Sequence, residues 1–276
     1  MSTTAASQRV RYYEDRERLL SPRMEARYCI GDEALNAFRM VCVDRIWRLS
    51  YIACAHDSTA FAAVRLFDRC MSATRPPICR TNMSLLTVAC FDICFKSTDG
   101  DFKPPLMSEY YTHGFLSKYN EHIIPMEKFG IKLREVQITV LKHVKGEPSL
   151  PTPYDYIVEC CPTWVTTNLW NTVSRRANLA VAAFSYVASS TNYTSEQIAG
   201  AAVHMALGDT HAAPTLEMLH LASDVLSAHE LVEVNTRMLC AIDSLFAISD
   251  KTSLYAFYYD MYREWRRFHT DRPQNV

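Results

Sequence analysis

Glycine is scarce in this sequence, and its scarcity constrains the fold more than any other feature. Only 7 of the 276 residues are glycine, whereas an average usage of roughly 7% gives about 19 in a chain of this length. Sandwiches, barrels and dinucleotide-binding sheets need glycine in tight turns and where the backbone approaches a ligand closely. The sequence therefore predicts an all-α protein.

Composition and charge narrow the class of protein further. Hydrophobic residues make up 49% of the chain and charged residues 21%, which is enough apolar surface for a sizeable core. The 29 basic and 30 acidic residues lack the basic excess of proteins that bind nucleic-acid backbones. The longest uncharged stretch, 177–195, is too polar for a membrane-spanning helix. We therefore expect no direct nucleic-acid partner and no membrane partner.

Apolar residues at helical spacing divide the first half of the chain into an arm and five helices. The arm covers residues 1–31, and the first repeat covers 32–150. The third helix contains a single charged residue, Asp92, and an apolar surface nearly all round is typical of a helix at the centre of a bundle. The five helices are expected at 32–49, 58–75, 83–95, 106–117 and 126–144.

The second half of the chain, 151–250, has the same plan. Its third helix is again the most apolar, and a short motif, Ala-Val-x-x-Phe, begins at both Ala63 and Ala180, which indicates a duplication. Residues 251–276 contain a last helix and the C-terminal tail. The remaining helices are expected at 153–161, 177–188, 195–207 behind a Thr194/Gln197 capping box, 216–226, 227–245 behind a Ser227/Glu230 capping box, and 254–268.

The local signatures of common catalytic sites are absent. There is no phosphate-binding loop, GxSxG, HExxH or CxxC motif. Cys90 and Cys94 have a spacing that two metal ligands can share, but no second pair completes a tetrahedral site, so we expect buried, reduced thiols. His211, His220 and His229 recur every nine residues. Nine residues turn a helix to its opposite face, so this spacing does not gather the three histidines on one face. We expect no catalytic residue, no metal and no cofactor, and a role in protein interaction.

Several residues of the first repeat resemble a cyclin box. The resemblance covers residues 11 to 265 and implies the cyclin fold, which consists of two five-helix repeats with an N-terminal arm and a C-terminal helix. In cyclins, an Arg on the first helix and an Asp on the second form a structural ion pair, and Arg39 and Asp68 match these positions. Leu85 and Lys96 match the family's Leu and Lys on either side of the third helix.

The resemblance also implies contact with a cyclin-dependent protein kinase. Cyclins bond to the kinase backbone through the Lys after the third helix and a Glu in the fifth helix, and the matching residues here are Lys96 and Gln137. An amide still accepts a hydrogen bond, but without the strength that charge adds, and Glu135 lies two residues upstream. For Lys96 alone, the alternative is a cation favoured at a helix C-terminus. The kinase-binding candidates are Lys96, Ser97, Leu133, Gln137, Val140 and Leu141, and the structural candidates are Arg39, Asp68 and Leu85.

Two segments resemble the transcription-type cyclins of the T, K and L kind. They are the arm around Tyr12-Tyr13 and Ser21-Pro22 and the segment 193–206. Mitotic cyclins have a substrate-docking patch on the first helix. The matching positions here are Phe38, Val41, Cys42 and Arg45, so an Arg replaces the Trp that forms the bottom of the docking groove.

We therefore expect a non-catalytic, activating subunit of a cyclin-dependent kinase in a transcription-linked complex. The resemblance implies a nuclear location, with the cytoplasm as a second one. The alternatives are a cell-cycle cyclin, a TFIIB-like transcription factor with the same fold, and a stand-alone helical enzyme.

Overall fold

The computed structural model describes residues 33–73, 80–99, 101–114, 124–148, 150–159, 167–209, 226–247, 258–260, 262–263 and 266. All regular elements in these ranges are helical, which confirms the all-α prediction. None of the helices within them is long and apolar enough to cross a membrane. The predicted arm, the predicted helix at 216–226 except its last residue, and most of the predicted helix at 254–268 lie outside the described residues.

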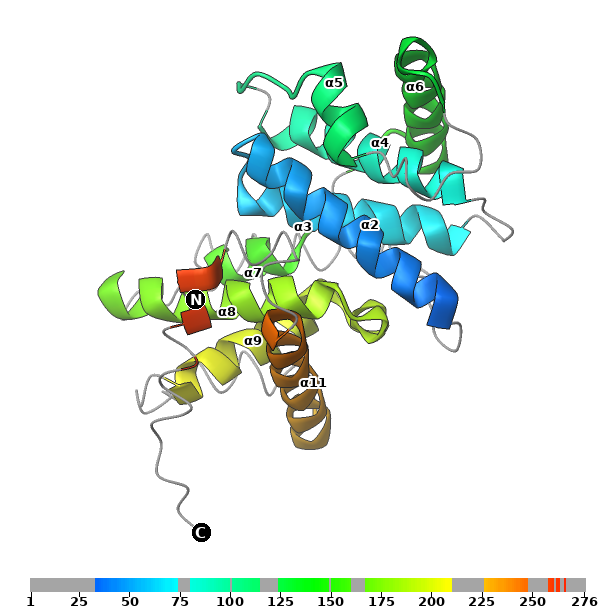
Figure 1. The fold of residues 1–276 in the computed structure, drawn as a ribbon. Coiled ribbons are helices and arrows are strands. Elements are labelled where there is room, and N and C mark those ends of the chain that lie inside the picture. The colour runs from blue at the N-terminus through cyan, green and yellow to red at the C-terminus, as the bar shows by residue number, and fades with distance from the viewer. Residues whose placement is uncertain are drawn as a thin grey trace, which may run out of the picture. The chain divides into compact units, whose positions relative to one another are not determined.

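The chain forms two compact units (Figure 1). The first unit contains the described residues up to Thr152 together with Ser185–Asn192, and the second contains those of Pro153–Phe184 and from Tyr193 onward. The helices of the first unit are α2 (Glu33–Ile52), α3 (Asp57–Ala73), α4 (Arg80–Thr98), α5 (Met107–Glu109), the π-helical turn η2 (Tyr110–Gly114), α6 (Met126–His143) and the 3-10 helix η4 (Ala188–Asn192). Those of the second are α7 (Pro153–Glu159), α8 (Thr167–Ser185, whose last residue belongs to the first unit), α9 (Ser195–Asp209) and α11 (Ala228–Ala247).

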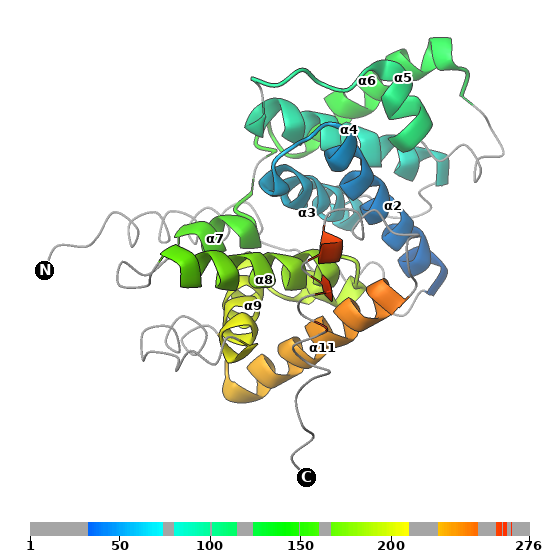
Figure 2. The same ribbon diagram turned by 60° about the vertical axis from the view of Figure 1, so that its left-hand side comes forward.

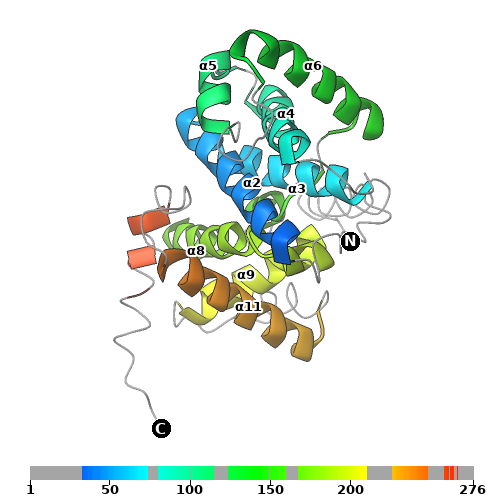
Figure 3. The same cartoon turned by 45° about the vertical axis from the view of Figure 1, so that its right-hand side comes forward.

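Helix α4 is the centre of the first unit, as its apolar sequence predicts. It contacts α2, α3, α6 and η2, and Figure 3 shows it between α6 on one side and α2 and α3 on the other. Because it is surrounded, its residues from Met83 to Phe95 are all buried, including the charged Asp92. This arrangement leaves the C-terminal end of α4, where Lys96, Ser97 and Thr98 are exposed, and the outer face of α6 accessible.

In the second unit, the apolar helix α9 contacts both α7 and α11. Figure 2 shows α7, α8, α9 and α11 together in this unit. Both predicted capping boxes are present. The Gln197 backbone N–H donates to Thr194 Oγ1 at 3.2 Å, and the Thr194 backbone N–H donates to Gln197 Oε1 at 3.0 Å. Ser227 and Glu230 make the same exchange at the start of α11. Each box satisfies amide groups that the first turn of a helix leaves unpaired.

Two predicted helices differ substantially from the observed ones. Helix α8 begins at Thr167 and ends at Ser185, whereas the sequence predicted 177–188. Its early start follows from Trp170 and Val173, which continue the buried stripe toward the N-terminus among polar neighbours that hide the pattern. The predicted helix at 106–117 is instead the short α5 followed by the wider turn η2, as far as Gly114. Residues 115–117 lie outside the described ranges.

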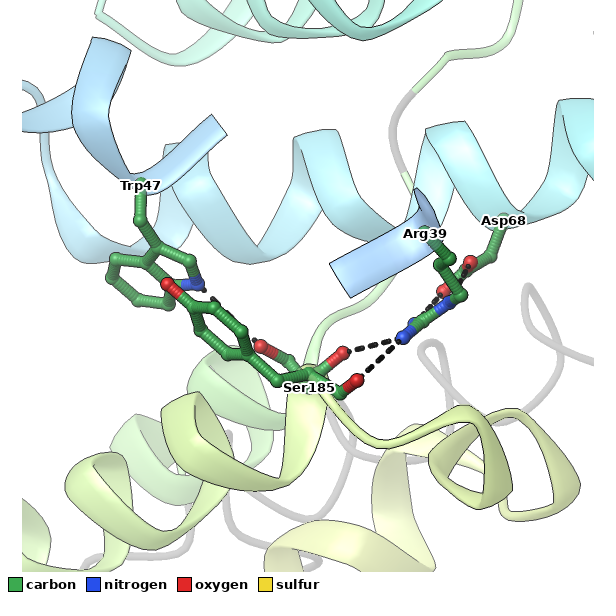
Figure 4. Close-up of polar contacts among 5 residues, drawn as sticks. Arg39, Trp47, Asp68 and Ser185 are labelled. Carbon is green, nitrogen blue, oxygen red and sulfur yellow. Dashed lines mark hydrogen bonds and ion pairs between the residues drawn. The ribbon is translucent and has the colours of Figure 1, made fainter. Parts of the chain in front are cut away.

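A buried arginine connects three segments of the first unit (Figure 4). The Arg39 guanidinium on α2 donates from Nε and Nη2 to the two carboxylate oxygens of Asp68 on α3, at 2.8 and 2.7 Å. Its Nη1 donates to the backbone carbonyls of Ser185 and Tyr186, at 2.9 and 3.3 Å. The ion pair that the sequence led us to expect between Arg39 and Asp68 is therefore present, and it also holds the segment that begins at Ser185.

Two further hydrogen bonds secure this segment to α2. Trp47 Nε1 donates to Ser185 Oγ at 3.4 Å, and the Tyr186 hydroxyl donates to Asp44 Oδ1 at 3.2 Å. Trp47 is fully buried with its ring edge-on to Phe61. Polar contacts inside an apolar surrounding fix one geometry, because each donor that lost its acceptor would remain buried without a partner.

We expect Asp68→Ala to destabilise the first unit by about 3–5 kcal/mol, because it leaves the Arg39 charge buried without its carboxylate. The measurement is urea unfolding followed by circular dichroism. Glu135→Ala is the control, since it removes an ion pair with Lys132 that lies on the exposed face of α6, and we expect little or no change from it. Equal losses in the two variants would contradict the structural role of the Arg39–Asp68 pair.

Gly114 lies where η2 approaches α2 and α4 closely. A Cβ at this position would be 2.7 Å from Val88 Cγ2 and 2.9 Å from Leu49 Cδ1. Both neighbouring side chains are buried, so they have little room to move.

We expect Gly114→Ala to cost about 1–3 kcal/mol in the free energy of unfolding, because it overpacks this contact. Gly208→Ala is the matched substitution, since Gly208 lies within α9 with no atom within 4 Å of the added Cβ. There we expect a gain of about 0.5–1 kcal/mol from helix propensity. Both values come from denaturant titrations, and a neutral Gly114→Ala would show that the contact is looser than described.

Candidate protein-binding site on helices α4 and α6

Lys96 and Gln137 meet at one carboxylate. Lys96 lies in the last turn of α4, and its Nζ is 2.6 Å from Asp92 Oδ2, one helical turn earlier. Gln137 lies on α6, and its Nε2 donates a hydrogen bond to the same oxygen. The two residues that the sequence singled out on separate helices are thus brought together by Asp92, which the sequence analysis did not include among the site residues.

Asp92 is the buried centre of a polar cluster that we define as Asp92, Lys96, Tyr110 and Gln137. Its side chain is 3% exposed. The Tyr110 hydroxyl donates to Asp92 Oδ1 at 2.6 Å, so both carboxylate oxygens are occupied. A buried carboxylate without such donors would be strongly unfavourable. A sequence signal for Asp92 existed: it is the lone charge in an apolar helix, four residues before a lysine.

Tyr110 remains a hydrogen-bond donor at all ordinary pH values. Burial raises the pKa of its hydroxyl far above the usual range, and the neighbouring charge of Asp92 and the hydrogen bond to it raise the pKa further. The ring lies edge-on to Phe91 with 6.3 Å between centroids, which fixes its position against α4. Asp92 Oδ1 therefore has a permanent donor from η2, and Oδ2 faces Lys96 and Gln137.

The outward side of the polar cluster offers both a donor and an acceptor. The Lys96 side chain is 60% exposed, so two of its three N–H donors remain available to water or a partner. A carboxylate only accepts hydrogen bonds, so Gln137 must turn its NH₂ group toward Asp92. Its Oε1 accepts no hydrogen bond from the part of the chain that the structure describes. The pair presents an ammonium beside an amide oxygen.

The other candidates divide between surface and core. Ser97 is exposed, and its hydroxyl donates to the Cys94 carbonyl of its own helix at 2.9 Å. Leu85 is buried on α4. Leu133 and Val140 are each 2% exposed, on the buried face of α6, which corrects their inclusion among residues available to a partner, because a core side chain presents no surface.

Leu141 belongs instead to an exposed apolar row on α6. Its exposure is 37%, and those of Ile131 and Ile138 are 63% and 48%. Separations of seven and ten residues place all three on one face of the helix. Leu141 was among the kinase-binding candidates from the sequence, whereas the two isoleucines were overlooked, because an apolar residue outside the buried stripe gives no periodic signal. We call Ile131, Ile138 and Leu141 the apolar row.

Exposed apolar side chains also occur in the segment between α4 and α6. Phe102, Leu106 and Met107, in the connection after α4 and the start of α5, are 53%, 55% and 42% exposed. Met107 lies against Gly130 of α6, since a Cβ there would be 3.8 Å from Met107 Cε. Through Met107, the exposed apolar surface of α6 thus extends beyond a single helix.

The cysteines of α4 do not form a reactive or metal-binding centre within the described ranges. Burial raises the pKa of Cys90, and a hydrogen bond with the Cys70 thiol raises it further, while burial also raises the pKa of Cys94. Such thiols stay protonated and are poor nucleophiles. Among the described residues, no three His, Cys, Asp or Glu side chains are placed to hold a metal ion.

Comparison with models of protein families and with curated proteins gives no match to this chain. The residues of the site are therefore the basis on which a function is proposed.

We expect Tyr110→Phe to destabilise the first unit by about 1–2 kcal/mol, because Asp92 Oδ1 loses a buried donor. The measurement is the free energy of unfolding in urea. Double-mutant cycles with Asp92→Asn provide the control: the loss from Tyr110→Phe should shrink once the carboxylate is an amide. Purely additive effects would contradict the contact.

Proposed function

We propose that this chain is a non-catalytic, activating subunit of a cyclin-dependent protein kinase, acting in a transcription-linked complex in the nucleus. The observation that carries the proposal is the meeting of Lys96 and Gln137 at Asp92. These are the two positions at which the resemblance to cyclins implies hydrogen bonds to the kinase backbone. A backbone segment offers one carbonyl and one N–H, which complement an ammonium and an amide oxygen.

The apolar row supports the same surface. Ile131, Ile138 and Leu141 follow the exposed face of the helix that carries Gln137. Burial of a fully exposed Ile or Leu contributes about 1.5–3 kcal/mol, so even partly exposed side chains add substantially to binding. A charged pair at the surface contributes about 0–1 kcal/mol. The polar cluster would therefore set orientation, while the apolar row would supply most of the affinity.

Activation would follow from differential affinity. A protein kinase is active only when its mobile helix brings a Glu to the Lys that holds the ATP phosphates. A rigid surface that binds this position more tightly than the displaced one shifts the population toward the active state. A shift from mostly inactive to mostly active needs about 5.5 kcal/mol of preference. This magnitude requires the apolar row as well as the polar cluster.

The rival functions are separated by a binding panel. It contains purified transcription-type cyclin-dependent kinases, purified cell-cycle-type kinases and a DNA duplex, each mixed with the chain and analysed by size-exclusion chromatography. We expect a one-to-one complex with a transcription-type kinase. A complex with a cell-cycle-type kinase would instead identify a cell-cycle cyclin. DNA binding without kinase binding would favour the TFIIB-like alternative, although the net charge of −1 argues against it.

Lys96→Ala and Ile138→Lys should each weaken kinase binding about tenfold or more while the chain stays folded. The first removes the exposed donor, and the second places a charge in the apolar row. Affinities are measured by titration calorimetry with the kinase that binds in the panel.

Matched substitutions elsewhere should leave that affinity unchanged. Arg48→Ala removes an exposed cation from α2, and Val232→Lys changes a 66% exposed apolar residue on α11. Weakening by the control variants as large as by Lys96→Ala and Ile138→Lys would show that the kinase does not bind at this surface.

A further inference from the structure

We propose that Asp92 is the positioning residue of the kinase-binding site: from α4 it supplies the negative charge that the resemblance places at position 137, and it orients both Lys96 and Gln137. This inference rests on the proposed function and deepens it. Its basis is the shared hydrogen-bonding of one carboxylate oxygen by Lys96 Nζ and Gln137 Nε2. In this chain the carboxylate lies on α4, whereas the amide oxygen that faces outward lies on α6.

The residue at position 137 is complementary to Asp92. A Glu at this position in the same orientation would bring a second carboxylate against an oxygen that only accepts hydrogen bonds. Two carboxylates at that separation repel, so one must move away or take up a proton. A Gln provides the donor that the buried Asp92 requires. The Lys–Asp–Gln set keeps the net charge of a Lys–Glu pair but moves the negative charge into the interior.

The same contact decides which atoms face a partner. Since Nε2 of Gln137 turns toward Asp92, its Oε1 points away from the carboxylate and accepts without a formal charge. A neutral amide oxygen favours a neutral donor such as a backbone N–H, whereas a carboxylate also attracts lysine and arginine side chains. Asp92 thereby makes the surface selective for main-chain donors through an atom that it does not itself expose.

Tyr110 makes this orientation rigid. Its hydroxyl occupies Asp92 Oδ1 at 2.6 Å, and it cannot ionise at ordinary pH because burial raises its pKa. With Oδ1 held by η2, rotation of the carboxylate would break a buried hydrogen bond. Oδ2 is therefore kept between Lys96 and Gln137, and both side chains are ordered before a partner arrives. Such preorganisation strengthens binding by lowering its entropic cost.

Exchanging the carboxylate and the amide between positions 92 and 137 tests the proposal. The variants are Asp92→Asn, Gln137→Glu and the double variant, and the probe is the purified cyclin-dependent kinase that the wild-type chain binds. In the double variant, the amide oxygen introduced at position 92 still accepts from Tyr110, and the new NH₂ group there donates to the carboxylate introduced at position 137. That carboxylate also pairs with Lys96. We expect each single variant to bind about tenfold more weakly and the double variant to return within about threefold of wild type.

Binding must be separated from folding. Circular dichroism and urea unfolding of the four isolated chains identify a temperature at which all are fully folded, and affinities are measured there. A merely structural Asp92 would leave the affinity of the folded single variants unchanged. A positioning Asp92 weakens their affinity, and the double variant restores it.

A second readout needs no kinase. Gln137 side-chain amide protons, followed by NMR, should exchange with water at least about tenfold faster in Asp92→Asn than in wild type, because the amide loses a charged acceptor. Unchanged exchange would overturn the proposed orientation. If wild type bound a kinase but the double variant did not recover binding, the role of Asp92 would be overturned and the proposed function would not. Failure of wild type to bind any kinase would overturn the proposed function and, with it, the site that Asp92 is proposed to position.

Discussion

The Arg39 guanidinium is fully buried, and the first unit is arranged so that its charge and its N–H groups are satisfied. Asp68 neutralises the charge from α3, and the carbonyls of Ser185 and Tyr186 accept from the remaining nitrogen. A buried cation tolerates few alternative arrangements, because loss of one acceptor costs more than the bond contributes. Three segments distant in sequence are therefore fixed by one side chain.

Asp92 follows the same rule elsewhere in the first unit. It lies in the central helix α4, and its two oxygens are satisfied by Tyr110, Lys96 and Gln137. Unlike the Arg39 pair, this cluster reaches the surface through Lys96. The hydrogen bonds of the buried Asp92 thus fix a donor and an acceptor at the surface beside the apolar row. The proposed kinase-binding function uses this pair.

The helices of the first unit were largely predictable from the sequence, because α2 and α6 each bury one face that periodicity reports directly, and α4 is apolar nearly all round. The ion pair of Arg39 with Asp68 followed from the resemblance to cyclins, whereas its bonds to Ser185 and Tyr186 depend on a distant segment that periodicity does not place. The early start of α8 was missed because polar residues interrupt its stripe.

At the site, Lys96 and Gln137 were identified, but their junction at Asp92 depends on how α6 lies against α4. Exposed residues such as Ile138 carry no periodic signal, so the apolar row needed the structure.

The most direct test is the rate at which a cyclin-dependent kinase phosphorylates a peptide, measured alone and with increasing amounts of this chain. If the chain shifts the kinase from mostly inactive to mostly active, the rate for at least one kinase should rise by up to about a hundredfold and saturate at one chain per kinase. Lys96→Ala should shift the curve to higher concentrations without changing its plateau. No stimulation of any kinase by the folded chain at any ratio would contradict the account.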